Sequence, residues 1–202
     1  MSLRKRIVSQ FEHPRGLLGR LVGLILSGRG SNLKRNRWTV EQLALQPGEA
    51  VLEVGCGPGV ALELCLSQRG VRAVGVDHSA LMIAQASRRN ARAVKEGRVR
   101  LIEGTVEAIP AGLGPFDKMF SINVIQFVDR PAFVARAKAL VKPGGMLATT
   151  YQPRHAKATR ADAVKMADEL TALLTQAGFA DVRTRELELK PVPAVCVLAR
   201  RG

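Results

Sequence analysis

The most informative segment of the sequence is Val51-Leu52-Glu53-Val54-Gly55-Cys56-Gly57-Pro58-Gly59. Its apolar start predicts a buried strand, and its alternating glycines let the backbone turn tightly and pass close to a ligand. A helix is predicted to follow, and its first N–H groups suit an anionic or polar ligand group. The spacing is G-x-G-x-G, with Val60 where the third glycine of a dinucleotide-binding loop falls, which disfavours a nicotinamide or flavin site.

Two acids accompany this loop. Glu53 ends the apolar run, where burial is costly unless the loop amides or a ligand offset it. Asp77 ends the next apolar run, so a parallel sheet brings both acids to its carboxyl-terminal edge, where open α/β sheets bind ligands. A carboxylate there can accept both hydroxyls of a ribose. The alternative for Asp77 is to cap the following helix, a position for which Ser79 competes.

The rest of the chain alternates predicted strands and helices. The strands are expected at 50–54, 71–76, 99–102, 118–122, 146–151, 182–189 and 194–199, and the helices at 33–45, 58–68, 79–97, 129–141 and 160–177. Pro191 and Pro193 separate the last two strands, which suggests an antiparallel pair. Repeated strand–helix units predict a parallel sheet with helices on both faces.

Five segments resemble, in order, the motifs of the class I S-adenosylmethionine-dependent methyltransferases. They are Glu53-Val54-Gly55-Cys56-Gly57-Pro58-Gly59, Gly75-Val76-Asp77-His78-Ser79 through Met82, Glu103-Gly104-Thr105-Val106-Glu107-Ala108-Ile109-Pro110, Phe116-Asp117 through Asn123-Val124-Ile125, and Leu140-Val141-Lys142-Pro143-Gly144-Gly145. The resemblance covers residues 47–200. It implies S-adenosylmethionine as cofactor and an α/β, Rossmann-like, seven-stranded, mostly parallel sheet that ends in an antiparallel hairpin.

The resemblance also implies a cofactor site. Its residues are Glu53, Gly55, Cys56, Gly57 and Gly59 at the methionine end, Asp77 on the ribose hydroxyls, His78 and Met82 in the pocket lining, Thr105 and Val106 beside the adenine, and Asn123 near the transferred methyl. One position departs from the family pattern, because Thr105 stands where an Asp usually reaches the adenine amino group. A hydroxyl can accept that hydrogen bond, and the backbone at Val106 is the alternative.

The acceptor end is less defined. His155 and Tyr151 follow or end the strand at 146–151 and are candidates for contact with the acceptor, His155 as a base. The segment Asn123-Val124-Ile125-Gln126 lacks the Asn/Asp-Pro-Pro-aromatic signature of methylases of base exocyclic nitrogens and glutamine amides, which disfavours that branch. We therefore expect in-line methyl transfer to a small or amphipathic molecule, with the acceptor atom undefined. The alternatives are a phospholipid or quinone-precursor methyltransferase docked on a membrane surface, and an RNA methyltransferase.

The net charge of +14 is concentrated in two regions, residues 1–40 and the helix expected at 79–97. We expect residues 1–46 to form a helical cap or lid with an amphipathic helix near 17–26, and residues 47–202 to form the methyltransferase domain. The basic start has three interpretations: a lid whose arginines are solvated, a contact with an anionic membrane surface, or phosphate binding on RNA. Few aromatic residues, 4% of the chain, disfavour nucleic acid without excluding it.

Three cysteines, Cys56, Cys65 and Cys196, show no CxxC spacing, which disfavours a disulfide framework and a zinc site. We expect no metal and a reducing, cytoplasmic location. No apolar run approaches the ~18 residues of a membrane-spanning helix. The oligomeric state is open.

Overall fold

The computed structural model describes residues 30–202, so the predicted helix near 17–26 and the first part of the predicted cap lie outside the described residues. Within that range, seven strands form one sheet in the order β3-β2-β1-β4-β5-β7-β6. The strands are β1 (Ala50–Val54), β2 (Arg72–Asp77), β3 (Val99–Glu103), β4 (Phe116–Ile122), β5 (Val141–Tyr151), β6 (Phe179–Leu187) and β7 (Ala194–Arg201). The first five strands pair in parallel, and β7 pairs antiparallel with both β5 and β6. The predicted sheet is confirmed.

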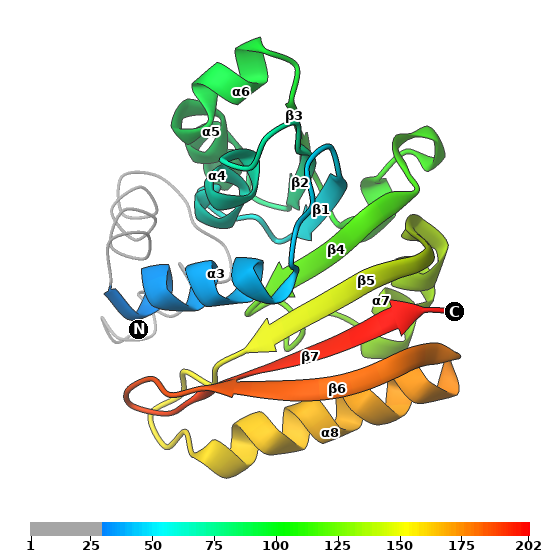
Figure 1. Ribbon diagram of the computed structural model, residues 1–202. Helices are drawn as coiled ribbons and strands as arrows, with labels where there is room; N and C mark the ends of the chain where they lie inside the picture. Colours follow the sequence, from blue (N-terminus) through cyan, green and yellow to red (C-terminus); the bar gives the residue numbers. More distant parts are fainter. Residues whose placement is uncertain (1–29) are drawn as a thin grey trace.

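Helices cover both faces of the sheet (Figure 1). They are α3 (Gly30–Gln42), α4 (Val60–Leu66), α5 (Ala80–Arg89), α6 (Ala91–Lys95), α7 (Arg130–Leu140) and α8 (Arg160–Gln176), with short 3-10 turns η1 (Val106–Ala108) and η2 (Ala111–Leu113). One core lies between the sheet and α7 and α8, and a second lies beneath α3 and α4. Because both faces are covered, Val51 to Val54 are all buried, as central parallel strands require.

Local sequence signals begin the helices at the expected places. Thr159 and Asp162 form a reciprocal capping box at the start of α8, and the Asp129 side chain accepts the Ala132 N–H at the start of α7. Gly59, at φ 77°, is the N-cap of α4 and ends the glycine loop in a left-handed conformation that suits glycine.

The helix expected at 79–97 is instead two helices, α5 and α6, so that prediction was wrong in its continuity. The chain breaks at Asn90, whose side-chain amide donates to the carbonyls of Ala86, 3.0 Å away, and Gly59, 3.1 Å away. An amide that bonds nearby backbone competes with helix continuation. Through this amide, Asn90 connects the junction between α5 and α6 to the glycine loop.

The fifth strand is longer than predicted, because β5 begins at Val141 rather than 146. Val141 pairs with Phe116, and regular pairing resumes at Lys118 with Met146 after an irregularity. The turn-forming Pro-Gly-Gly residues lie inside this irregular start, where Gly144 takes a positive φ of 74°. The strand then ends at Tyr151, as expected.

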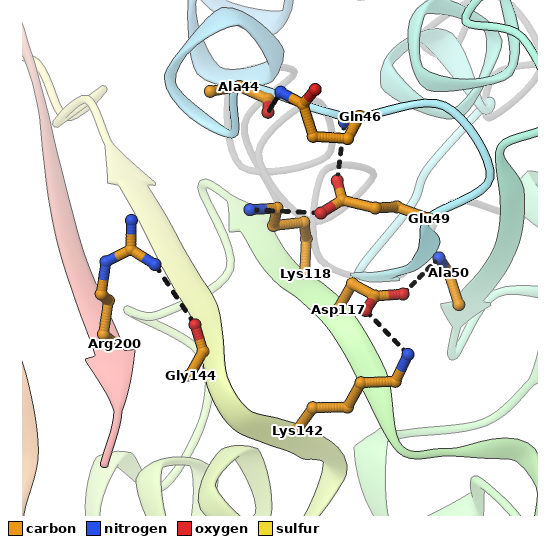
Figure 2. A network of polar contacts seen from close by, with 9 residues as sticks. All are labelled: Ala44, Gln46, Glu49, Ala50, Asp117, Lys118, Lys142, Gly144 and Arg200. Atoms are coloured by element: carbon orange, nitrogen blue, oxygen red, sulfur yellow. Dashed lines mark hydrogen bonds and ion pairs between the residues drawn. The ribbon is translucent and has the colours of Figure 1, made fainter.

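A set of paired charges closes the amino-terminal edge of the sheet (Figure 2). The Asp117 carboxylate accepts the Ala50 N–H at 2.8 Å and the Lys142 ammonium at 2.7 Å. The Glu49 carboxylate lies 3.5 Å from the Lys118 ammonium and accepts the Gln46 N–H at 2.9 Å. Asp117 and Glu49 therefore each have both a cation and a backbone donor.

Candidate cofactor and acceptor site

The glycine loop between β1 and α4 is held close to its neighbours. The N–H groups of Gly55 and Cys56 both donate to the Val76 carbonyl, at 2.8 and 3.0 Å. A Cβ on Gly55 would lie 2.3 Å from the Val124 side chain, so only glycine fits between β1 and the loop after β4. The loop is thus packed between the ends of β2 and β4, at the edge where the sequence predicts the ligand.

Glu53 lies beneath this loop and is 2% exposed. Burial raises the pKa of its carboxyl well above the usual range, the nearby Asp77 raises it further, and a hydrogen bond from the Leu62 backbone opposes both. Leu62 is in the first turn of α4, so Glu53 caps that helix from a strand. Its Oε2 atom has no hydrogen-bond partner within the described part of the chain.

Asp77 supports the loop directly. Its Oδ2 accepts the Gly57 N–H at 2.8 Å and its Oδ1 accepts the Ser79 N–H at 2.9 Å. Ser79 is the side-chain cap of α5, as the sequence suggested. Each carboxylate oxygen retains a further lone pair, so Asp77 can brace the loop and still accept two hydroxyls.

The remaining predicted cofactor residues differ in what their side chains reach. His78 is half exposed, with Nδ1 3.8 Å from Asp77 Oδ1, while Met82 and Val106 are buried. The Thr105 hydroxyl donates to the Glu107 carboxylate, which leaves its oxygen free to accept. The Cys56 thiol packs in the core beneath α4, and burial raises its pKa well above the usual range.

Asn123 adopts a left-handed conformation at φ 57° immediately after β4. Its N–H donates to the Thr150 carbonyl, and its Oδ1 accepts the Gln152 N–H, both at 2.8 Å. The Asn123 side chain therefore connects the end of β4 to the residue that follows β5. The sequence predicts the transferred methyl group of the cofactor beside this connection.

The sequence analysis missed Arg35, on α3. Its guanidinium is 3% exposed, donates to Gln152 Oε1 at 2.6 Å and to Asn32 Oδ1, and has an Nε atom without a partner among residues 30–202. Burial, with the repulsion of Arg154, lowers its pKa to about 9, so it is still charged at neutral pH. No carboxylate of the described residues forms an ion pair with it.

The candidate acceptor residues are Tyr151, the last residue of β5, and His155, in the segment that follows it. His155 Nε2 is 3.5 Å from Asp162 Oδ2, and Asp162 is fixed by the Thr159 N–H and hydroxyl. Tyr151 is half-buried, and burial and the Asp162 charge raise the pKa of its phenol. The structure thus brings Tyr151 and His155 toward the same carboxylate.

Within the described residues, no group of three or more His, Cys, Asp or Glu side chains is arranged to hold a metal ion. No helix of residues 30–202 is long and apolar enough to cross a membrane.

A doubly wound sheet with this loop, an acid at the end of β1 and another at the end of β2 defines a Rossmann-like nucleoside-cofactor site. A family model described as a methyltransferase domain matches residues 51–145. The uncharacterized methyltransferase YdaC of Bacillus subtilis is 33% identical over 183 residues, covering 90% of this chain and 98% of that protein. The chain belongs to the class I S-adenosylmethionine-dependent methyltransferases, and it is an enzyme that uses S-adenosylmethionine.

Two further similarities are weaker, one in coverage and the other in sequence identity. A ubiquinone biosynthesis O-methyltransferase of Pseudomonas paraeruginosa is 33% identical over 130 residues, which are 63% of this chain and 54% of that protein. The N-methyltransferase NodS of Bradyrhizobium japonicum, solved with S-adenosyl-L-homocysteine, superposes with a TM-score of 0.71 at 15% identity, covering 88% of this chain and 90% of that one. At that identity, NodS supports the fold alone.

Proposed function

We propose that this methyltransferase transfers the cofactor's methyl group in line to a small or amphipathic acceptor, with the cofactor's amino-acid end held between Glu53 and Arg35. One observation carries the binding assignment. Both side chains are buried ionisable groups, and each keeps one polar atom without a partner in residues 30–202. A buried charge of this kind is costly until it is paired.

The chemistry of the cofactor fits those two charges. Its methionine end carries an ammonium and a carboxylate, which match an acid on β1 and a guanidinium on α3. Arg35 offers a bidentate fork, the geometry that suits a carboxylate. We assign Glu53 to the ammonium and Arg35 to the carboxylate, with Gly55, Gly57 and Gly59 shaping the loop between them.

The other predicted contacts complete the proposal. Asp77 accepts the ribose hydroxyls through its remaining lone pairs, with His78 and Met82 beside it. Thr105 and Val106 border the adenine, where the Thr105 oxygen accepts from the amino group. Cys56 contributes through its backbone, because its thiol lies in the core.

When bound, the cofactor supplies an activated methyl group on its sulfonium. In-line transfer would require the acceptor atom, the methyl carbon and the sulfur to lie on one line, so the chain's main task would be to hold both partners in that arrangement. An acceptor that must lose a proton also needs a base. His155, oriented by Asp162, is our candidate, with Tyr151 as a contact to the acceptor.

Calorimetric titration with S-adenosylhomocysteine tests the binding assignment. We expect one site in the wild-type chain and an affinity loss of about tenfold or more in Asp77→Ala, since that variant removes a charged acceptor. Asp168→Ala, on α8, is the matched control and should bind as the wild type does. Absence of binding by the wild type, or equal affinity in Asp77→Ala, contradicts the site.

The acceptor class is tested by a separate screen. The partial similarity to a ubiquinone biosynthesis O-methyltransferase favours including quinone precursors. Phospholipids are included to test the membrane-docked alternative. Methylation of water-soluble small molecules alone supports the main proposal, whereas turnover that requires vesicles supports a membrane-docked enzyme. Turnover of RNA with a steep dependence on salt contradicts both.

A further inference from the structure

We propose a second ligand site, distinct from the cofactor site, in a basic groove at the amino-terminal edge of the sheet, which binds a phosphate-bearing small molecule with an apolar body. The groove is lined by the starts of β1, β2 and β3 and by the segment from η2 into β4, and it has a volume of about 370 Å³. Ligand pockets of small molecules fall in this range of size. The glycine loop lies at the other end of the same strands.

The sheet register directs positive charge into this groove. In the parallel pairing of β2 with β3, Val74 lies opposite Arg100, so their side chains share a face with Arg72, two residues before Val74. Arg98 and Lys142 also line the groove. Four cationic side chains therefore surround one hollow.

The four cationic side chains differ in whether an acidic side chain pairs with them. Arg98 pairs with Glu96, with Nε 2.8 Å from Oε2, and Lys142 pairs with Asp117 at 2.7 Å (Figure 2). Arg72 and Arg100 are exposed and form no ion pair with any residue in 30–202. No acidic residue of the described part of the chain lines the groove. The hollow therefore carries about two uncompensated positive charges, and a concave wall concentrates their field.

The floor between these cations is apolar. Val74 and Phe116 are buried there, and Leu113 and Pro115 flank them. A bare inorganic anion uses the arginines alone, whereas an aromatic or aliphatic phosphate ester also covers the floor. Guanidinium groups recognise phosphate through paired hydrogen bonds, which favours a phosphate over a carboxylate of lower charge. These features select a phosphate ester of roughly nucleotide size.

The probe is 1-naphthyl phosphate, which has a dianionic phosphate and an apolar ring but no adenosine. Titrated by calorimetry into the full-length chain saturated with S-adenosylhomocysteine, it should bind at one saturable site and more tightly than inorganic phosphate. In Arg72→Gln/Arg100→Gln the affinity should fall at least tenfold. The matched control Arg88→Gln/Arg185→Gln removes two exposed arginines outside the groove and should stay within twofold of the wild type.

Four results would overturn the proposal: no saturable binding, equal affinity for inorganic phosphate, an equal loss in the control, or binding only to the chain without S-adenosylhomocysteine. Sedimentation with vesicles of phosphatidylglycerol and phosphatidylcholine separates a lipid headgroup from a free ester. Vesicle binding that depends on Arg72 and Arg100, without binding of 1-naphthyl phosphate, assigns the groove to a membrane instead. Both double variants should bind S-adenosylhomocysteine as the wild type does, so this test is independent of the proposed cofactor contacts.

Discussion

At the amino-terminal edge of the sheet, Asp117 and Glu49 each contact a lysine and a backbone N–H, whereas at the carboxyl-terminal edge Glu53 and Arg35 are buried and each has a polar atom without a partner among residues 30–202. Asp117 and Glu49 are partly exposed, and each already has its hydrogen-bond and ion-pair partners within the chain. The buried acid and guanidinium at the opposite edge still lack partners within residues 30–202, and once ionised they complement the ammonium and carboxylate of a zwitterion. An acid that is paired within the chain supports the structure, whereas a buried ionisable group whose polar atom has no partner within residues 30–202 marks a binding position.

The largest expected effect comes from Arg35. Arg35→Gln should weaken S-adenosylhomocysteine binding by at least about 30-fold, because losing one member of a buried charge pair costs ~2 kcal/mol or more. Arg35→Lys, which keeps the charge but not the fork, should recover part of the affinity. Calorimetry measures both, and circular dichroism checks that each variant is folded. The matched control is Arg37→Gln on the exposed side of α3. If Arg35→Gln binds within threefold of the wild type, the carboxylate assignment is wrong.

Glu53→Gln should have two opposite effects. It should weaken S-adenosylhomocysteine binding by about tenfold, since a charged hydrogen bond to the ammonium is lost. It should also raise the melting temperature of the cofactor-free chain by a few degrees. The folded pKa of Glu53 lies above its unfolded value, so its stabilising contribution is complete below the unfolded pKa and is lost as pH rises through the folded pKa. At neutral pH the neutral amide therefore removes a cost.

The same carboxyl predicts proton release on binding. Because the ammonium favours ionised Glu53, affinity should increase as pH rises from acid to neutral, and calorimetry in buffers of different ionisation enthalpy should detect the released proton. In Glu53→Gln this release should disappear. A wild-type affinity that falls with increasing pH over that range contradicts the pairing.

At the amino-terminal edge of the sheet, Asp117 is the acid to compare with Glu53. Burial raises the pKa of its carboxyl, but the Ala50 N–H and Lys142 outweigh burial, so the pKa lies below its usual range. Asp117→Asn should therefore cost about 1 kcal/mol of unfolding free energy at neutral pH and leave cofactor affinity unchanged. The wild-type advantage is complete above the unfolded pKa of about 4 and should shrink as pH falls through the folded value. Urea denaturation at several pH values measures this difference in stability. If Asp117→Asn bound S-adenosylhomocysteine tenfold more weakly than the wild type, the two edges would not differ in function as proposed.

The smallest effect is expected at Thr105. Thr105→Val should weaken S-adenosylhomocysteine binding by about threefold, because one neutral hydrogen bond contributes about 0.5–1.5 kcal/mol. Thr184→Val, on the distant strand β6, is the control and should change nothing. If Thr105→Val binds S-adenosylhomocysteine with the affinity of the wild type, the adenine contact is assigned instead to the backbone at Val106.

The parts of the fold that depend on local chemistry could be predicted from the sequence. Gly59 turning into α4, the Thr159 capping box and the Asp129 cap all rest on residues within a few positions of one another. The loop and Asp77 were also placed correctly at one edge, because parallel strands bring their carboxyl ends together.

Arg35 could not be predicted in this way. Its burial depends on Gln152, 117 positions away, and on Thr39 of the same helix meeting Thr150 of β5 at 2.8 Å. In the sequence it is one arginine among many in a basic segment. The break at Asn90 was missed for the same reason, since its amide is satisfied by Gly59, 31 positions earlier.

The unpaired Glu53 also has a consequence for the protein's lifetime in a cell. If its pairing with the ammonium lowers the free energy of the folded state alone, the folded fraction depends on how much cofactor is present. Chaperones and proteases act on the unfolded fraction, so a fall in cofactor supply would shorten the enzyme's half-life. A cell short of methyl donor would then clear this consumer of methyl groups through protein turnover, without any dedicated regulator.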